Sequence, residues 1–377
     1  MRDQRSRPAA AVAVLVLCLT VLLACSETQP RPGQQASTRA APGDRDTRAT
    51  VVRRMARELV RSGSAPGVVV VLRRGPRVQV VTEGLADTAS GAPMSARARF
   101  HVASLTKPVV ATVVMQLVQF GRLSLDDTVE SWLPGLVGRG RLITVRQLLD
   151  HTSGLPDYTD VPAAWPVLDR PPVDQRALVV AAGRAEPSFA PGAGQKYSNT
   201  DYALLGLVVE RVTGRRLEDV VESRVLTPLG LASASLRASR VREEPLVHGY
   251  VHGTDATDWD LTWGWAAGGL VTDGTDVDRF FAGLFAGDLV SPRIVEEMAE
   301  PAAGALGAWS GYGLGLAELP TPCGPAVGHS GVVDGYVSAA YTNRHDGSAV
   351  VLLVNTDRSL ETGPLHDLLT TALCGPS

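Results

Sequence analysis

Lysine is almost absent from this chain. Of its 36 lysine and arginine residues, only Lys107 and Lys196 are lysines. Most surface positions accept either cation, but arginine stays protonated at any working pH, whereas a desolvated lysine can lose its proton and act as a base. A sequence that uses arginine nearly everywhere keeps lysine where arginine cannot replace it. The two lysines are therefore the first residues to examine for chemistry.

An excess of positive charge is also missing. The net charge of −3 gives no reason to expect nucleic acid or an anionic membrane surface as the main partner. Hydrophobic residues make up 45% and charged residues 20% of the chain, the balance of an ordinary globular protein with a sizeable core. Its 377 residues suffice for one large domain or two closely packed ones.

The N-terminus has the pattern of an export signal. Arginines at 2, 5 and 7 precede the apolar run 9–24. Leu22-Leu23-Ala24-Cys25 resembles a bacterial lipobox, in which the cysteine is acylated and becomes the first residue. We expect a lipoprotein-type signal peptide over 1–24, lipidation of Cys25, and a protein that is secreted or held at the outer face of the cytoplasmic membrane. Cleavage after Ala24 without lipid and a retained anchor are the alternatives.

Cysteine is scarce, with four residues in all. Cys18 would leave with the signal peptide and Cys25 would carry lipid, so Cys323 and Cys374 remain. In an oxidising compartment two remaining cysteines favour a disulfide. The alternative is a pair of buried thiols.

Hydrophobic periodicity predicts an α/β (α+β) fold, with strands near both ends of the chain and helices between them. The predicted helices are 49–62, 109–120, 202–213, 277–285 and 365–373, and the predicted strands are 68–73, 77–83, 100–103, 336–343 and 349–355. We expect a flexible linker over 25–48, because its polar and proline-rich composition cannot bury a core. The sheet domain would then comprise 49–120 and 260–377, with the mostly helical domain 121–259 inserted.

The first motif with chemical content is Ser104-Leu105-Thr106-Lys107. Pro108 and an apolar helical run follow, so Ser104 and Lys107 would lie side by side at a helix N-terminus. Free backbone N–H groups and the helix dipole favour a developing oxyanion there. A buried lysine deprotonates more easily and can take the serine proton. In a chain with only two lysines the motif is specific.

The second motif is Tyr197-Ser198-Asn199, in a loop composition just before a helix. A tyrosine beside a protonated lysine would have its phenolate favoured, which makes Tyr197 a candidate base or proton shuttle. Phenol and amine would each have to shift by about three pKa units to work near neutrality. The alternative is a surface loop whose Asn199 caps the following helix. Lys196 is expected to point to solvent.

The third motif, His329-Ser330-Gly331, opens a stretch typical of a strand. A strand edge carrying histidine and serine beside the nucleophile could bind a substrate carboxylate, and a backbone N–H there could complete an oxyanion hole. Taken alone, these three residues more often have no function.

In this order, the three motifs resemble the serine β-lactamase and D-alanyl-D-alanine peptidase family. Class A enzymes carry Ser-x-x-Lys, Ser-Asp-Asn and Lys-Thr-Gly, whereas Tyr197 and His329 look like the branch of class C lactamases and soluble D,D-carboxypeptidases. The resemblance covers about 65–374, including the segments 148–154, 266–269 and 312–316. It implies an antiparallel sheet flanked by helices, an inserted mostly helical domain, and a site between them. His151, within the first segment, is expected to be structural.

The resemblance also implies roles for single residues. Ser104 would be the acylated nucleophile and Lys107 its proton partner. Tyr197 would relay protons to the leaving group and activate the deacylating water, and Asn199 would orient the lysine and the substrate amide. No cofactor or metal is implied. His248 and His252 are four residues apart but lack a convincing third ligand, so solvated loop histidines are the better interpretation.

Substrate binding is implied at His329–Gly331, and the oxyanion hole at the backbone N–H groups of Ser104 and Val332. Trp263 resembles an aromatic wall of the cleft, although a packing tryptophan is equally consistent with the sequence. Carboxypeptidase relatives tend to carry arginine where this chain has Ala317-Glu318. That departure argues against a strict specificity for D,D-carboxypeptidase substrates.

The function predicted first is therefore a D-alanyl-D-alanine carboxypeptidase of the penicillin-binding type. A β-lactamase or esterase of the same family and a slowly turning over penicillin-binding lipoprotein are the alternatives. The expected partners are small-molecule or peptide substrates, namely a peptidoglycan stem peptide, a β-lactam or an ester. No nucleic acid is expected, and contact with a membrane only through the lipid anchor.

Overall fold

The structure is a computed structural model that describes residues 44–236 and 246–377, except 303, 359, 361 and 377. The predicted signal peptide, Cys25 and most of the predicted linker lie outside the described residues. The described residues belong to one compact unit. The predicted division of the chain into a sheet domain and an inserted helical domain stays a prediction.

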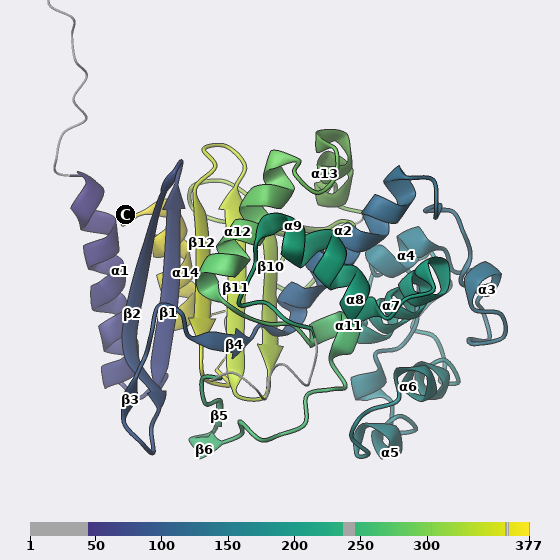
Figure 1. Cartoon of the computed structure of the whole chain (residues 1–377), viewed down its shortest axis with the longest axis horizontal. Helices are drawn as coiled ribbons and strands as arrows, with labels where there is room; N and C mark the ends of the chain where they lie inside the picture. Colours follow the sequence, from purple (N-terminus) through teal and green to yellow (C-terminus); the bar gives the residue numbers. More distant parts are fainter. Residues whose placement is uncertain (1–43, 237–245, 303, 359, 361, 377) are drawn as a thin grey trace, which may run out of the picture. The chain divides into compact units, whose positions relative to one another are not determined.

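The centre of the fold is an antiparallel sheet of eight strands, in the order β3-β2-β1-β12-β11-β10-β9-β8 (Figure 1). Its strands are β1 (Gly67–Arg74), β2 (Arg77–Asp87), β3 (Ala92–Pro93), β8 (Gly311–Tyr312), β9 (Ala317–Leu319), β10 (Ala326–Val333), β11 (Tyr336–Asn343) and β12 (Ala349–Val354). β1 pairs with β12, so strands from the two ends of the chain complete one sheet. The predicted antiparallel sheet flanked by helices is confirmed.

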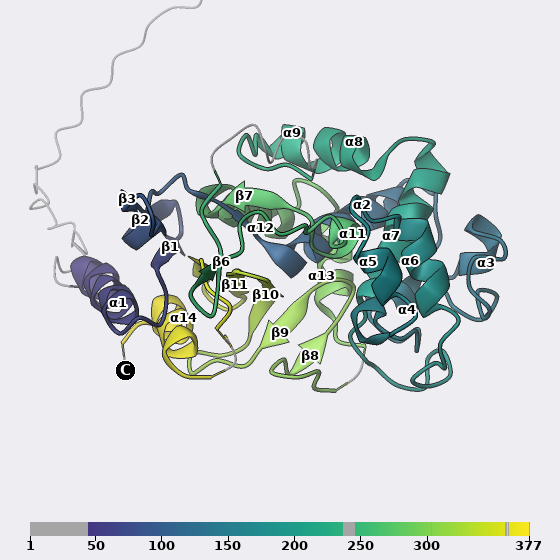
Figure 2. The ribbon, with the colours of Figure 1, turned by 90° about the horizontal axis from the view of Figure 1, so that it is seen from below.

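Both faces of this sheet are covered. Helices α1 (Asp44–Arg61) and α14 (Pro364–Cys374) cover one face, and α12 (Gly274–Ala286) covers the other (Figures 1 and 2). Alternate residues of β1 enter separate cores: Val68 and Val70 pack with α1 and α14, while Val69 and Val71 join the larger core on the α12 side. This explains why the strand reads as a continuous apolar run instead of an alternating one.

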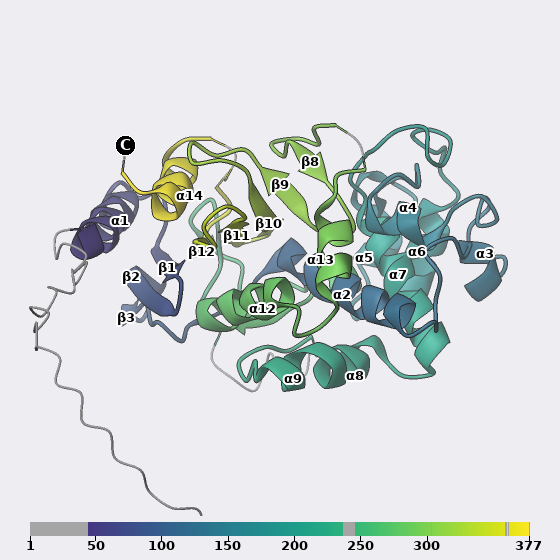
Figure 3. The same cartoon turned by 90° about the horizontal axis from the view of Figure 1, so that it is seen from above.

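The larger core continues into a group of helices beyond β10. These helices are α2 (Thr106–Gln119), α3 (Val129–Trp132), α4 (Val145–Leu149), α5 (Trp165–Leu168), α6 (Gln175–Ala182), α7 (Asn199–Thr213), α8 (Leu217–Val221), α9 (Thr227–Leu229), α11 (Trp265–Gly268) and α13 (Pro292–Ala299). Helix α2 is buried along nearly its whole length and packs against α11 and against α7, beside which it lies in Figure 3. Two short strands, β4 (Arg99–His101) and β7 (Val271–Asp273), pair with each other and lead into α2 and α12.

Several elements differ from the sequence predictions in their bounds or were not predicted. α1 begins at Asp44 rather than at 49, because nothing in 44–48 opposes a helix. The short strands β3, β8 and β9 were not predicted, since two or three residues carry no readable period. β10 begins at Ala326, so His329 lies within the strand and does not open it.

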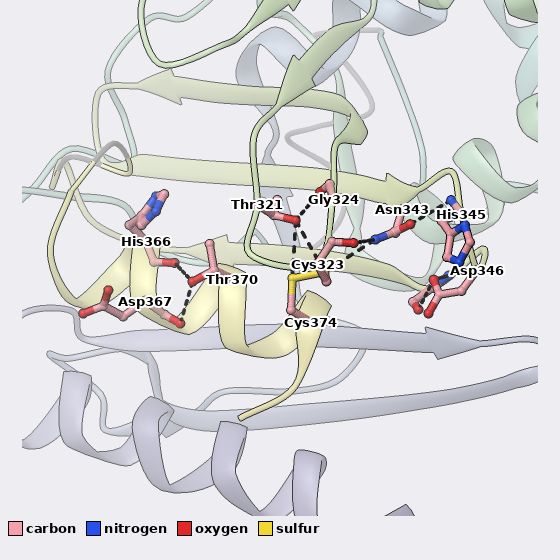
Figure 4. The surroundings of a disulfide bond; sticks show 11 residues. Thr321, Cys323, Gly324, Asn343, His345, Asp346, His366, Asp367, Thr370 and Cys374 are labelled. Atoms are coloured by element: carbon pink, nitrogen blue, oxygen red, sulfur yellow. Dashed lines mark hydrogen bonds between the residues drawn. A yellow bond between two sulfur atoms is a disulfide. The ribbon is translucent and has the colours of Figure 1, made fainter. Parts of the chain in front are cut away.

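A disulfide joins Cys323, in the loop before β10, to Cys374 at the end of α14 (Figure 4). Asn343 on β11 donates to the carbonyl oxygen of Cys323 at 3.0 Å. Closing a loop of 51 residues constrains the unfolded chain and contributes about 4 kcal/mol to stability on the loop-entropy estimate. Among the described residues, no helix is both long and apolar enough to span a bilayer.

Candidate active site

Ser104 lies in a tight turn directly before α2. The turn is the 3₁₀ helix η1 (Ala103–Leu105), and Ala103 adopts a φ of 47°, which is unfavourable for a residue with a side chain. The hydroxyl of Thr106 holds this turn in place: it donates to the Ala103 carbonyl at 2.7 Å and accepts from the Leu270 N–H at 3.0 Å. Ser104 is thus presented at the helix N-terminus, as the sequence predicts.

Lys107, in the first turn of α2, is fully buried beside Ser104. Its Nζ lies 3.0 Å from Ser104 Oγ, 2.7 Å from Asn199 Oδ1 and 2.8 Å from the Ala267 carbonyl oxygen. Burial lowers the pKa of Lys107 to about 7, although the charges of Asp157 and Asp201 act in the opposite direction.

The contacts of Lys107 also orient its lone pair. The Asn199 and Ala267 oxygens can only accept hydrogen bonds, so a neutral amine gives one N–H to each of them. Its lone pair then faces the remaining neighbour, Ser104 Oγ, at 3.0 Å. The neutral form of Lys107 is therefore positioned to accept the serine proton.

Tyr197 approaches the same oxygen from the loop before α7. Its hydroxyl donates to Ser104 Oγ at 2.8 Å, and Lys107 Nζ lies 4.6 Å from the centre of its ring. Desolvation raises the pKa of Tyr197 well above its usual value, and this effect exceeds the opposite effect of its hydrogen bond with Ser104. The prediction that both groups shift toward neutrality is therefore right for Lys107 and wrong for Tyr197, because burial favours the neutral phenol.

Asn199 is the first residue of α7, and Ser198 occupies the N-cap position that the alternative interpretation assigned to Asn199. Its Oδ1 accepts from Lys107, and its Nδ2 donates to Asp157 Oδ2 at 2.9 Å. An N–H donor on one side and a carboxylate on the other decide which amide atom is oxygen and which is nitrogen. Asn199 is thus locked against Lys107, as predicted for an orienting residue.

Asp157 was not identified from the sequence. Its Oδ2 accepts from both the backbone N–H and the side chain of Asn199, and its Oδ1 accepts from Thr159. The residue is 6% exposed and stands 42 positions before Asn199 in the chain. Nothing in the local pattern separates this aspartate from an ordinary loop residue, so only the folded chain reveals it.

The third motif lies on β10 beside the nucleophile. His329 is fully buried; its Nδ1 faces the Ser330 carbonyl oxygen, and its Nε2 lies 3.1 Å from the Tyr312 hydroxyl. A carbonyl only accepts, so Nδ1 carries the proton and Nε2 accepts from Tyr312. Burial lowers the pKa of His329 to about 3, so this ring is neutral at working pH.

Gly331 brings β10 against the nucleophile. A Cβ at this position would lie 2.7 Å from the backbone nitrogen of Ser104 and 2.6 Å from the Val102 oxygen, so no side chain fits. The next residue, Val332, is 57% exposed at its side chain, on a strand whose backbone touches the turn of Ser104. The backbone N–H groups of Ser104 and Val332 remain our predicted oxyanion hole.

Aromatic rings surround these groups. Trp309 lies 5.9 Å from the Tyr197 ring and 5.0 Å from the His329 ring, between ring centres, and its Nε1 donates to Tyr341 at 2.8 Å. Burial raises the pKa of Tyr341 to about 12, although its hydrogen bonds with Trp309 and Ser330 act in the opposite direction. The sequence motifs do not include Trp309, because a single tryptophan in a glycine-rich loop carries no pattern.

Trp263 and His151, two further residues named in the sequence analysis, each pack against a tyrosine. Trp263 is half-buried and packs edge-on against Tyr158, whose hydroxyl donates to the Trp263 carbonyl at 3.1 Å. Its role as a cleft wall stays a prediction. His151 is fully buried, and its Nδ1 lies 3.0 Å from Asp201 Oδ2. Its ring packs against that of Tyr197, with 4.5 Å between the ring centres.

His248 and His252 each pair with a different carboxylate. His248 Nδ1 lies 2.7 Å from Asp255, and His252 Nδ1 lies 3.0 Å from Asp357. Within the described ranges, no group of three histidine, cysteine or acidic side chains is arranged to hold a metal ion.

Comparison with known proteins shows the family of this chain. A family model described as Beta-lactamase matches residues 52–373. The chain belongs to the beta-lactamase family. Penicillin-binding protein 4 of Amycolatopsis lactamdurans is 31% identical over 333 residues, which cover 82% of this chain and 85% of that protein.

Solved structures of the beta-lactamase family agree in fold. A D-stereospecific amidohydrolase from Streptomyces sp. is 32% identical, with a TM-score of 0.75 over 87% of this chain and 99% of that one. D-amino acid amidase from Ochrobactrum anthropi is 26% identical, with a TM-score of 0.78 over 86% and 98%. As a member of this family, the chain is a serine hydrolase.

Proposed function

We propose that the protein hydrolyses amide or ester bonds of small or peptide substrates through an acyl-enzyme on Ser104. One observation carries the proposal: Lys107 Nζ and Tyr197 OH both lie within 3.0 Å of the same serine oxygen. An amine with a lowered pKa and a neutral phenol supply a base and an acid at one atom.

Acylation uses the two groups in turn. Ser104 Oγ forms a bond to the acyl carbon as its proton passes to the Lys107 amine, and the oxyanion is held by backbone N–H groups at Ser104 and Val332. The bond to the leaving group then breaks as the leaving nitrogen or oxygen takes the proton of the Tyr197 hydroxyl. The Lys107 ammonium returns its proton to the phenolate, so both groups regain their starting forms.

Deacylation uses Tyr197 as its proton relay. Water enters where the leaving group departed and forms a bond to the acyl carbon. Its proton passes through the Tyr197 hydroxyl to Ser104 Oγ, 2.8 Å away, and the bond between serine and acyl carbon breaks. Asn199 and Asp157 keep Lys107 in place throughout.

The substrate class we propose is an acyl compound containing a D-amino acid. The relatives named D-stereospecific amidohydrolase and D-amino acid amidase support it, as do relatives named D-aminopeptidase at 26% and 27% identity. A peptidoglycan stem peptide ending in D-alanyl-D-alanine, predicted from the sequence, also contains D-amino acids, and its free carboxylate is the feature that distinguishes it from the amides.

A second candidate function is a penicillin-binding protein that is acylated and turns over slowly. The relative named penicillin-binding protein 4 supports it. Covalent labelling by a fluorescent penicillin without turnover of peptides, nitrocefin or p-nitrophenyl esters would favour this candidate over the first.

We propose further that the protein is exported and tethered by lipid at Cys25, or secreted. The arginine-led apolar run over 9–24 supports this localisation. The Cys323–Cys374 disulfide is consistent with it, since such bonds persist in oxidising compartments.

Trapping the acyl-enzyme tests the proposed function. Purified protein is mixed with p-nitrophenyl acetate and quenched in acid within milliseconds to seconds, and its intact mass is measured. We expect a mass increase of one acetyl group, located by peptide mapping to the peptide that contains Ser104. Hydrolysis of the ester with no covalent adduct at any time point would contradict the acyl-enzyme.

Tyr197→Phe is expected to separate substrates by their leaving groups. An amine must be protonated to leave, so the acylation rate with a D-amino acid amide should fall about a hundredfold. p-Nitrophenolate leaves without a proton, so the rate of the p-nitrophenol burst should fall by about threefold at most. Equal losses with both substrates would show that Tyr197 does not protonate the leaving group.

A further inference from the structure

We propose that Glu318 makes this site select substrates that carry no free carboxylate beside the scissile bond. The inference rests on the proposed Ser104 acyl-enzyme and names the charge of the substrates it accepts. Neutral amides and esters would react, while the same acyl group joined to a free amino acid would react slowly.

A substrate carboxylate needs a cation or unpaired N–H donors, and Lys107 offers neither. As an ammonium it has three N–H donors, and its contacts to Ser104, Asn199 and Ala267 occupy all three. The side chain is also fully buried. Its N–H groups therefore all bind protein atoms of the site, and its positive charge already interacts with Asp157 and Asp201.

His329 offers no positive charge either. Both of its ring nitrogens face protein groups, the Ser330 carbonyl and the Tyr312 hydroxyl. The side chain is fully buried, so protonation would place a charge in a site without a counter-ion. Of the charged groups that shift the pKa values of Lys107, Tyr197 and His329, none of those identified in the described structure is an arginine.

Glu318 adds a negative charge on the same side of the sheet. In the pairing of β9 with β10, Glu318 lies directly opposite Val327, and residues opposite each other point to the same face. Val327 and His329 are two apart on β10, so they too share that face. From strand spacing, the Cα atoms of Glu318 and His329 are about 8 Å apart.

The carboxylate of Glu318 is hydrogen-bonded to the segment that carries Trp309. Ser310 Oγ donates to Glu318 Oε1 at 2.8 Å, and the residue before Ser310 is Trp309, whose ring lies 5.9 Å from that of Tyr197. Glu318 is half-buried on β9. Over the ranges that the structure describes, it makes no salt bridge, so a cation of the protein does not neutralise it.

A carboxylate without a salt bridge, on a residue whose Cα lies about 8 Å from that of His329, repels a second carboxylate and attracts a cation. At an effective dielectric constant between those of water and protein, this interaction changes rates by about tenfold. Salt would weaken it, because part of the field passes through solvent.

The test compares N-acetyl-D-alanyl-D-alanine with its C-terminal amide, which has the same scissile bond and differs in one charge. We expect kcat/KM for the amide to exceed that for the free acid by about tenfold in 50 mM salt, and the gap to narrow in 500 mM salt. Equal rates, or faster hydrolysis of the acid, would overturn the inference.

Two variants assign the effect to Glu318. Glu318→Gln should narrow the ratio, and Glu318→Arg should invert it in favour of the acid. Glu58→Arg is the matched control, because Glu58 is exposed on α1, across the sheet from the site, and the change in net charge is the same. Its ratio should stay at the wild-type value. A ratio that shifts equally in Glu58→Arg would show a general charge effect and overturn the assignment.

p-Nitrophenyl acetate separates failure of this inference from failure of the proposed function. Its hydrolysis reports the acyl-enzyme without testing charge selection. If the ester forms no adduct on Ser104, the proposed function fails. If the ester reacts normally while acid and amide react alike, the proposed function stands and the role of Glu318 fails.

Discussion

Ser104→Ala is expected to reduce ester and amide hydrolysis by at least a thousandfold and to abolish the acetyl adduct. The serine oxygen is the atom on which Lys107 and Tyr197 converge, so without it there is no covalent route. The fold should survive, because the substitution removes one small polar group from a half-buried turn. Steady-state kinetics, intact mass and a thermal melt measure the three outcomes.

Ser198→Ala is the control for that prediction. Ser198 is buried next to Tyr197, but its Oγ has no hydrogen-bond partner in the described structure. Replacing it removes an unsatisfied polar group, so activity should stay within about threefold and stability should not fall. Residual turnover of wild-type size in Ser104→Ala, with Ser198→Ala unchanged, would rule out the proposed nucleophile.

Lys107→Arg is expected to be nearly as damaging, with a loss of about a thousandfold or more. Arginine keeps its proton at any working pH, so it cannot accept one from Ser104. In the wild type, the pKa of Lys107 is lowered to about 7, so kcat/KM should rise from pH 5 to 8 and level off above. The value of kcat/KM rises with pH because the neutral amine of Lys107 is the active form and acid protonates it.

The chain supplies a matched control in its other lysine. Lys196 is exposed one residue before Tyr197, and Lys196→Arg should leave activity and its pH profile unchanged. Because arginine is larger than lysine and Lys107 is fully buried, Lys107→Ala is the companion variant. Added methylamine should restore part of its activity, with a pH dependence that follows the amine. A Lys107→Arg enzyme that keeps wild-type turnover would disprove the base.

Much of the site could be predicted from the chain alone. Ser104 and Lys107 are three positions apart, so one helical turn brings them together whatever surrounds them. The scarcity of lysine marked Lys107 before any motif was considered. Tyr197 and His329 were candidates from their own motifs, but only the resemblance joined them to Ser104, because their distances to it along the chain carry no local signal.

Other features could not be predicted, for physical reasons. Asp157 orients Asn199 across 42 residues, and Glu318 reaches the site through the pairing of β9 with β10. Such contacts depend on strand register and helix packing, which no short pattern encodes. The direction of the Tyr197 pKa shift belongs to the same group, since it depends on how much water the folded protein removes.

Local sequence thus specified the nucleophile, the amine beside it, and most of the helices and strands, because neighbours in the chain stay neighbours in space. Tertiary structure decided which proton each group carries and which charges face the substrate. Burial and long-range pairing set both properties, and both arise only when distant segments meet. Hence Lys107 was recognisable from residue identity and spacing, whereas Glu318 gained its place only when β9 paired with β10.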